Sequence, residues 1–587
     1  MPELGSLRIN SAETVYVSSA HWSAILESIS ELRGYVQSRD QDELAQESNV
    51  VPETPIDQTQ QSYEGLDLFS GRIPAISKLE LVAAMPDRAV ANRLVYRYFN
   101  SFLLTPVMIH RPSFLRQYEE FWANPLQTDT MWIALLYGTM CLASSRESLS
   151  TTRSLSDRRL IGGSQQEYLK GLIQGLILGD FSRGGDYVVV AMVHYLFIEH
   201  LRRPDMISGN WLLLGMIIRL ALRMGYHRDP SRFPELSPLQ GELRRRLWLA
   251  LYSADLLLSI QMGVPRMIKD GQWDTKPPRN LFDDDFNESS QELPPSRPFT
   301  ETTPVSSQLD KFELLQVIAK ISDMTLAITE GQHPCPNPAV ESLDTLLRST
   351  YDSIPECRKF TSISNSLMVP PDKILDQLVV SIFFRKGLII LHRWHVMSSA
   401  TMEAPYGDIA RNSGANSDIA ASIQIYVRAA LEILEYQDLV YSEIKPNGVL
   451  SELKWTIPSS LSHEFLMATS VLCTHLYRTA TNAVGVEKAN TFVEGDAQLR
   501  AIKQSLVRAC EIWKMESTFS KDAERMAEMV TALLEKLQTR GEPQHDSTRP
   551  AADLAAKDLP SQALAQNGHD SFFLYLESYE ALERSLF

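Results

Sequence analysis

Residues 223–231 read RMGYHRDPS, and the His227-Arg228-Asp229 triplet within them is the one that opens the catalytic loop of protein kinases. In that loop the Asp is the catalytic base, and an Asn five residues later holds a magnesium ion. Here the corresponding position is Pro234, no G-x-G-x-x-G lies upstream, and no Asp-Phe-Gly follows. The triplet therefore does not predict phosphoryl transfer, and another explanation is needed.

Other sequence patterns that would indicate catalysis or metal binding are also missing. The sequence contains no G-x-S-x-G, no H-E-x-x-H and no phosphate-binding loop. Its five cysteines are far apart, whereas structural zinc sites use close pairs. Asp283-Asp284-Asp285 could coordinate a hard cation, but a solvated linker is the favoured interpretation. We expect no catalytic residue, no metal ligand and no bound cofactor.

The composition is that of an acidic globular protein. The 587 residues are 44% hydrophobic and 22% charged, and the formal charge is −16. Phosphate backbones repel such a surface unless basic residues are segregated on one face, so general nucleic-acid binding is not expected. The most apolar run, 211–226, is interrupted by Arg219 and Arg223, so no membrane span is expected.

Hydrophobic periodicity predicts the fold class. Segments 38–62, 274–308 and 539–569 lack it and are rich in Pro, Gln, Ser, Asp or Glu, so they are expected to be linkers or disordered. The remainder is helical, without strand alternation or a fixed repeat, which indicates an all-α, large irregular multi-helix domain with disordered linkers. The predicted organisation is an N-terminal segment at 1–37, a linker at 38–80, a core at 81–273, a polar loop at 274–308, a helical continuation at 309–538, a linker at 539–569 and a terminal helix at 570–587.

Two predicted helices flank the triplet. The first covers 207–225, with Gly225 where a left-handed C-cap is wanted. Ser237 caps the second, with Pro238 in the first helical position and Gln240 completing a capping box. Further helices are predicted at about 89–104, 130–143, 187–201, 309–329, 370–398, 418–437, 464–484, 496–514 and 521–538.

These two helices carry a resemblance to a known family. The runs GNWLLLGMIIRLALRMGYHRDPS and SPLQGELRRRLWLALYSADLLLSIQMGVPRMI resemble the middle homology region of fungal-specific transcription factors of the zinc-cluster class. Residues 98–122 look like the family's aromatic helix and its His-Arg-Pro-x-Phe turn, and 13–36 resemble the segment before that region. The resemblance covers about 13–290. The residues that match the family motif are Gly225, His227, Arg228, Asp229, Glu242, Arg244, Arg245, Arg246, Leu247, Trp248, Asp255, Gly263 and Pro265.

The triplet is explained as a structural joint between the two helices. His227 and Arg228 follow the carbonyl end of a helix, where a cation is favourable by about 0.3 to 1 kcal/mol. Asp229 can accept local backbone donors or pair with an arginine of the next helix. A joint is therefore favoured over an active site.

Arg244, Arg245 and Arg246 could neutralise phosphates of a nucleic acid. Successive helical positions, however, point in different directions and cannot form a single contact face. One or two of them are expected to pair with Glu242, Asp229 or Asp255, and the other to face water.

The family reads DNA through an N-terminal module in which six closely spaced cysteines bind two zinc ions. No cysteine precedes Cys141 here, so the two zinc ions have no ligands in this sequence. Two accounts stay open. The protein is a regulator without its own DNA reader, or its recorded start omits an upstream exon that encodes the module.

At the other end, residues 569–587 mix acidic and bulky apolar residues. Phe572, Leu576, Tyr579 and Leu582 have helical spacing, which fits either an activation segment that binds coactivators or a terminal helix that docks on the protein's own core.

The resemblance implies a fungal transcriptional regulator of one metabolic pathway, such as a secondary-metabolite gene cluster, located in the nucleus. Its partners would be the transcription machinery or a DNA-bound protein, with promoter DNA contacted indirectly, or directly if the zinc module exists. The alternative is a ligand-sensing or interaction protein that binds a small-molecule effector and controls a separate DNA-binding partner. An enzyme is the least favoured interpretation.

Overall fold

The computed structural model of the chain describes residues 6–9, 14–27, 29, 66–100, 105–150, 155–203, 205–327, 337–366, 368–400, 415–454, 457–482 and 492–539. Residues 540–587 lie outside the described residues. They include the predicted C-terminal helix with Phe572, Leu576, Tyr579 and Leu582. The predicted linker at 38–62 also lies outside the described residues.

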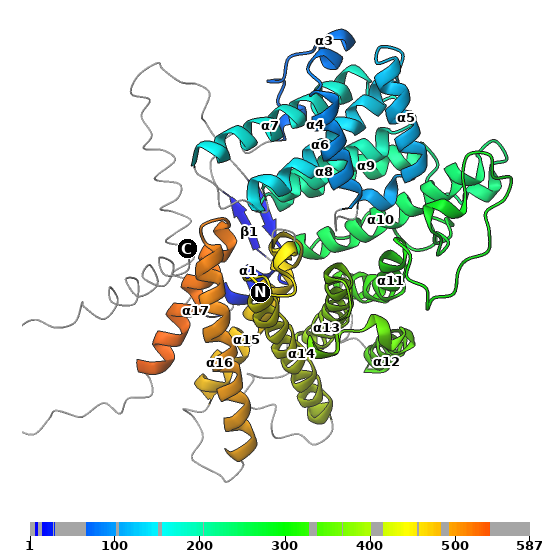
Figure 1. Cartoon of the computed structure of the whole chain (residues 1–587). Coiled ribbons are helices and arrows are strands. Elements are labelled where there is room, and N and C mark those ends of the chain that lie inside the picture. Colours follow the sequence, from blue (N-terminus) through cyan, green and yellow to red (C-terminus); the bar gives the residue numbers. More distant parts are fainter. Residues whose placement is uncertain are drawn as a thin grey trace, which may run out of the picture. The chain divides into compact units, whose positions relative to one another are not determined.

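The described residues confirm the all-α prediction (Figure 1). Each of the nine further helices predicted above falls on a helix of the structure, whereas α1, α3, α5, α7 and α12 were not predicted. The helices are α1 Trp22–Glu27, α3 Lys78–Ala83, α4 Arg88–Phe99, α5 Arg111–Ala123, α6 Thr130–Ser150, α7 Leu155–Leu178, α8 Val188–Arg202, α9 Ile207–Arg223, α10 Pro238–Met262, α11 Ser306–Leu326, α12 Asn337–Ser353, α13 Pro371–Ala400, α14 Ala415–Glu443, α15 Ile457–Asn482, α16 Phe492–Glu516 and α17 Lys521–Thr539.

One short hairpin was missed. Strand β1 (Ser6–Ile9) pairs antiparallel with β2 (Thr14–Val17), with Ser6 opposite Val17. Strands of four residues are too short for alternation to distinguish them from a loop. After the hairpin, helix α1 packs on α15 and buries Trp22 and Leu26. The N-terminal segment thus becomes part of the C-terminal helical core.

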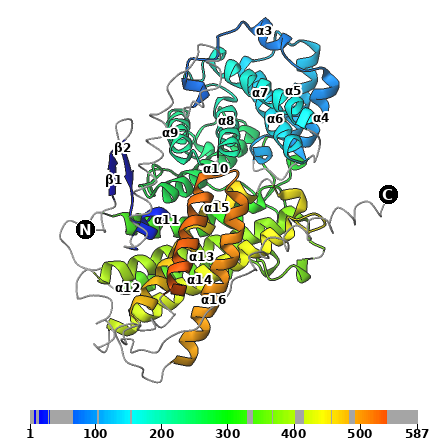
Figure 2. The same cartoon turned by 90° about the vertical axis from the view of Figure 1, so that its left-hand side faces the viewer.

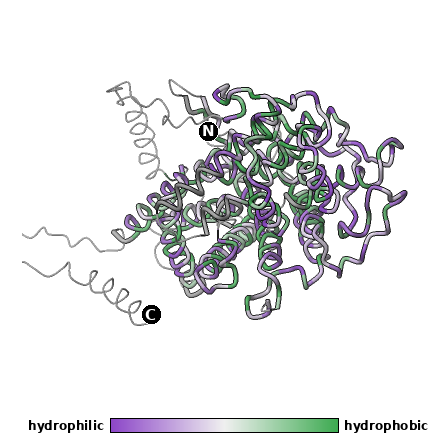
Figure 3. The backbone as a smooth tube through the Cα atoms, turned by 45° about the horizontal axis from the view of Figure 1, so that its top comes forward, coloured by the Kyte–Doolittle hydropathy of each residue, from purple (hydrophilic) through white to green (hydrophobic). Residues whose placement is uncertain are grey.

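The helices form two packed groups connected by α10. In the first group α6 contacts α4, α7 and α8, and α8 contacts α9. Helix α10 contacts both α9 and α11, and the second group follows from α11 to α17 (Figure 1). Figure 2 shows α13, α14, α15 and α16 running beside one another. The hydrophobic stretches lie where helices meet (Figure 3), and one continuous core extends from Trp22 to Leu533.

Local capping signals set several helix boundaries. Ser237 accepts a hydrogen bond from the backbone N–H of Gln240, and the Gln240 side chain accepts one from the N–H of Ser237, which confirms the capping box of α10. His110 accepts from the N–H of Ser113 and caps α5. The His-Arg-Pro-x-Phe motif therefore begins a helix, where a turn was expected, because Pro is favourable in the first turn.

Candidate functional site

The joint between α9 and α10 is built around a left-handed glycine. Gly225 has φ +75°, and the N–H of Tyr226 donates to the carbonyl of Ala221 at 3.0 Å, which closes the end of α9. The predicted C-cap at Gly225 is confirmed. A side chain at this φ would be strained, so the glycine lets the chain turn sharply and place Asp229 beside α10.

Asp229 is the centre of the joint. Its carboxylate accepts from Arg245 Nε at 3.0 Å and Nη2 at 2.8 Å, and from the N–H groups of Ser231 at 3.1 Å and Lys276 at 2.9 Å. Burial alone would raise the pKa of Asp229, but the hydrogen bonds from Arg245 and Ser231 outweigh it and hold the pKa well below its usual range. An ionised carboxylate saturated by fixed donors is a structural anchor, because it has little basicity left for proton transfer.

His227 differs from the expectation of a cationic helix cap. Burial is the main cause that lowers its pKa, and the neighbouring Arg228 lowers it further, so the imidazole is neutral at pH 7. Its ring lies near Trp248, with ring centroids 6.4 Å apart. Its backbone carbonyl accepts from the N–H of Asp274 at 3.0 Å. His227 therefore contributes a contact with Trp248 and a backbone acceptor.

The three successive arginines of α10 have three different partners. Arg244 donates to the carbonyl of Met224 at 2.8 Å, at the end of α9, and its guanidinium lies 4.5 Å from the ring centre of Tyr226. Arg245 binds Asp229, as described above. Arg246 is fully buried, and the expectation that one arginine faces water is wrong, since Arg244 is partly buried and the side chain of Arg245 is only 11% exposed. Each of the three arginines therefore contacts a different part of the protein.

Arg246 connects α10 to the long loop that follows. It donates from Nη1 to Asp283 Oδ1 at 2.7 Å and lies 3.4 Å, from Nε to Oε1, from Glu242 one turn earlier. Burial raises the pKa of Glu242, against the opposing influence of Arg246. Glu242 also accepts from the N–H of Arg279 at 3.3 Å. The buried arginine and glutamate thus anchor both ends of residues 279–283 on α10.

The loop 274–308 was predicted to be a linker or disordered, and in the structure it is an ordered irregular segment. Asn280 is fully buried and donates from its side chain to the carbonyls of Arg297, Pro298 and Glu301. Asp285 accepts from Arg297 Nη2 at 2.6 Å. The polar composition led to a wrong prediction because these polar side chains form hydrogen bonds with one another and with the backbone inside the protein. The two arginines of the segment, Arg279 and Arg297, stand on either side of the aspartate run at 283–285, and this placement was the signal that could have revealed it.

The aspartate run does not present a shared cation site. Asp283 is committed to Arg246 and to the N–H of Arg111 at 2.9 Å, and Asp285 is committed to Arg297. Asp284 is exposed. Among the described residues, no group of three or more His, Cys, Asp or Glu side chains is placed to hold a metal ion.

The remaining motif residues organise the other end of α10. Gly263 ends the helix with φ +66°, and the Asp255 carboxylate accepts from the N–H groups of Met267 at 3.2 Å and Ile268 at 2.7 Å. Arg266, in the loop that follows α10, donates from Nη2 to Asp323 of α11 at 2.7 Å. The sequence analysis did not predict this contact. Leu247 and Trp248 are buried in the core, and Pro265 is exposed in the loop.

The described part of the chain contains no helix that is long and apolar enough to cross a membrane.

These contacts show that the protein is an all-α domain in which the charged motif joins two helices and the loop that follows them. Residues 95–354 match the fungal specific transcription factor domain. The chain is 32% identical over 543 residues to the equisetin cluster transcription factor eqxF of Fusarium heterosporum, covering 92% of this chain and 73% of that protein. It is 33% identical over 577 residues to the pyrrolocin cluster transcription factor fsdR of Fungal sp. (strain NRRL 50135), covering 96% and 70%.

A third relative is the Zn(2)-C6 fungal-type transcription factor pigI of Monascus ruber, 33% identical over 548 residues that cover 92% of this chain and 63% of that protein. The chain belongs to the fungal-specific transcription factor family. The family and these relatives are transcription factors, a class of protein distinct from enzymes.

Proposed function

We propose that this protein regulates the transcription of one secondary-metabolite gene cluster through its helical domain. The observation that carries the proposal is the extent of the similarity to regulators named for single clusters, which includes both helical groups and the α10 joint between them. The joint supports it, because its carboxylates and guanidinium groups are engaged in holding helices together. A rigid helical scaffold of this kind suits a domain that transmits a signal between distant surfaces.

In this proposal the core at 81–273, the loop at 274–308 and the continuation at 309–538 form one regulatory domain, with the motif residues from Gly225 to Pro265 in structural roles. The protein acts in the nucleus, on the transcription machinery and on promoter DNA, which it reaches directly or through a DNA-bound partner. Residues 570–587 serve as an activation segment.

The test combines gene disruption with promoter occupancy. Disruption should abolish the transcripts of one cluster of neighbouring biosynthetic genes and its product, and re-expression should restore both. Chromatin immunoprecipitation of the tagged protein should recover the promoters of those genes. Unchanged cluster transcripts in the disruptant would refute the proposal. Occupancy that disappears when a second DNA-binding protein is deleted would assign DNA reading to that partner.

The terminal segment is tested separately. The full chain fused to an unrelated DNA-binding domain should activate a reporter, and removal of 570–587 should reduce activation. Unchanged reporter activity in a still-folded protein removes the activation role of Phe572, Leu576, Tyr579 and Leu582.

A further inference from the structure

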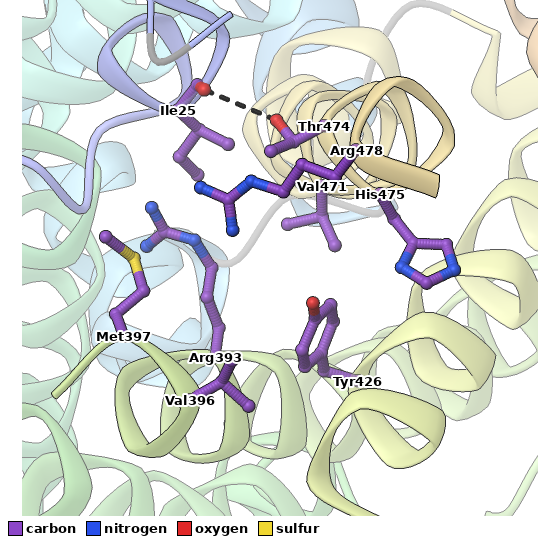
Figure 4. Close-up of a pocket in the computed structure, with 9 residues that line it drawn as sticks. All are labelled: Ile25, Arg393, Val396, Met397, Tyr426, Val471, Thr474, His475 and Arg478. Carbon is purple, nitrogen blue, oxygen red and sulfur yellow. Dashed lines mark hydrogen bonds between the residues drawn. The ribbon is translucent and has the colours of Figure 1, made fainter. Parts of the chain in front are cut away.

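Residues 18–29, here called the docking segment, pack on the C-terminal helical group although they come from the other end of the chain. Four of their side chains are spaced along one helical face and are each at most 2% exposed, namely those of Trp22, Ile25, Leu26 and Ile29. Helix α1 contacts α15, and Ile25 lines a small pocket together with side chains of α13, α14 and α15 (Figure 4). Burial of one apolar helical face against other helices is a common mode of peptide recognition.

The C-terminal group also binds the main chain of the docking segment. Arg393 of α13 donates from Nη2 to the carbonyl of Ser19 at 3.1 Å. Thr474 of α15 donates to the carbonyl of Ile25 at 3.3 Å (Figure 4). The part of α13 and α15 that carries Arg393 and Thr474 is here called the receiving surface. It binds two main-chain carbonyls and covers one apolar stripe, and the docking segment carries all of these features itself.

The docking segment is far along the chain from the surface that receives it. Ser19 and Arg393 are 374 residues apart in the sequence. Residues 30–65 connect the segment to Leu66 and lie outside the described residues. Because a chain spans at most about 3.3 to 3.6 Å per residue, this connection can reach up to about 120 Å. The docking segment of one molecule can therefore reach the receiving surface of another, where it forms again the contacts that it leaves in its own molecule.

We propose that the receiving surface also accepts the docking segment of a second copy of this chain, so that two molecules associate by exchanging this segment. The structure itself identifies the occupant, because a second copy carries the same apolar stripe and the same carbonyls. Exchange of an identical element between protomers is a low-cost route to dimers. Docking within one molecule does not depend on protein concentration, whereas exchange does, so wild-type dimers should increase with concentration. The inference goes beyond the proposed function and does not depend on it.

The experiment mixes two full-length variants, each with one half of the contact impaired. Leu26→Ala truncates a fully buried side chain of the docking segment and keeps the receiving surface, whereas Arg393→Gln removes the guanidinium that binds the Ser19 carbonyl and keeps the segment. Size-exclusion chromatography with light scattering should show each variant alone as a monomer and their equimolar mixture as a dimer. The dissociation constant of the mixed dimer should be at least about tenfold lower than that of either variant alone, because only the mixture contains an intact segment and an intact surface that have both lost their own partners.

The control mixture pairs Leu26→Ala with a copy that carries both substitutions, so that no intact docking segment is present, and it should stay monomeric. The inference is overturned if the first mixture stays monomeric or if the control mixture dimerises equally. Circular dichroism of each variant establishes that it is folded. Where one is not, Ile25→Val and Thr474→Val take the two places, since they remove one methyl group from the segment and one hydrogen bond from the receiving surface, and the same comparison of mixtures decides.

Discussion

The joint makes a quantitative prediction for Asp229→Asn. The substitution keeps the shape of the side chain and removes the charge that Arg245 faces through hydrogen bonds of 3.0 and 2.8 Å. The side chain of Arg245 is only 11% exposed, so its charge becomes buried without its carboxylate partner. Breaking a buried pair from one side costs about 3–5 kcal/mol. With an unfolding entropy of about 2 cal/mol/K per residue, the melting temperature should fall by about 3–5 °C if the described helices unfold together.

The assay is thermal unfolding followed by circular dichroism at 222 nm, with Asp284→Asn as the matched control. Asp284 is exposed in the ordered loop, so the same chemical change there should alter stability by less than about 0.5 kcal/mol. The pKa of Asp229 is lower in the folded protein than its unfolded value of about 3.9. Its contribution is therefore fully present above that value and is lost as the pH falls through the folded pKa.

The effect of Asp229→Asn should accordingly be the same at pH 6 and pH 8. Equal melting temperatures for Asp229→Asn and wild type would refute the joint as a stabilising element. A marked difference between pH 6 and pH 8 would show that another group titrates in its place.

Three further predictions follow from other contacts. Gly263→Ala should destabilise by more than about 1 kcal/mol and speed hydrogen exchange at residues 22–27, because its φ is +66° and an added Cβ would lie 2.3 Å from Ser18 Cβ. Lys386→Met should cost about 3–5 kcal/mol in denaturant unfolding, because it leaves Glu464, 2.7 Å away and 2% exposed, as an unpaired buried charge. Burial lowers the pKa of His194 to about 4, so stability should be full above about pH 6.5 and fall between pH 6.5 and 4, where only the unfolded state binds the proton.

Each of these has its own control. Gly71→Ala has the same φ of +66° with nothing within 4 Å, so it should show the backbone cost alone, and an equal loss at Gly263 would exclude the steric contact. Adding Glu464→Leu to Lys386→Met should recover most of the lost stability, and a further loss would contradict the argument. His194→Gln should reduce the acid slope without abolishing it, because burial also lowers the pKa values of His463 and His475, and an unchanged slope would contradict the assignment to His194.

Local patterns were sufficient to predict most helices. The spacing of apolar residues, the capping box at Ser237 and the glycine at 225 each depend on backbone geometry within a few residues, and the structure contains all of them. Helix α7 was missed because Gly162, Gly163 and polar neighbours interrupt its apolar pattern. The hairpin at Ser6–Val17 was missed because its strands are too short to show a period.

The sequence by itself therefore determined the helical class, the boundaries of the joint and the family, because these are written in local spacing and in an ordered motif. Tertiary structure alone decided which charged side chains are buried and which residues they pair with. Arg246 meets Asp283 across 37 residues, and Arg393 meets Ser19 across 374, so no local pattern reports either contact. The lowered pKa of His227 has the same origin, because burial and the neighbouring Arg228 outweigh the opposing influence of Asp274.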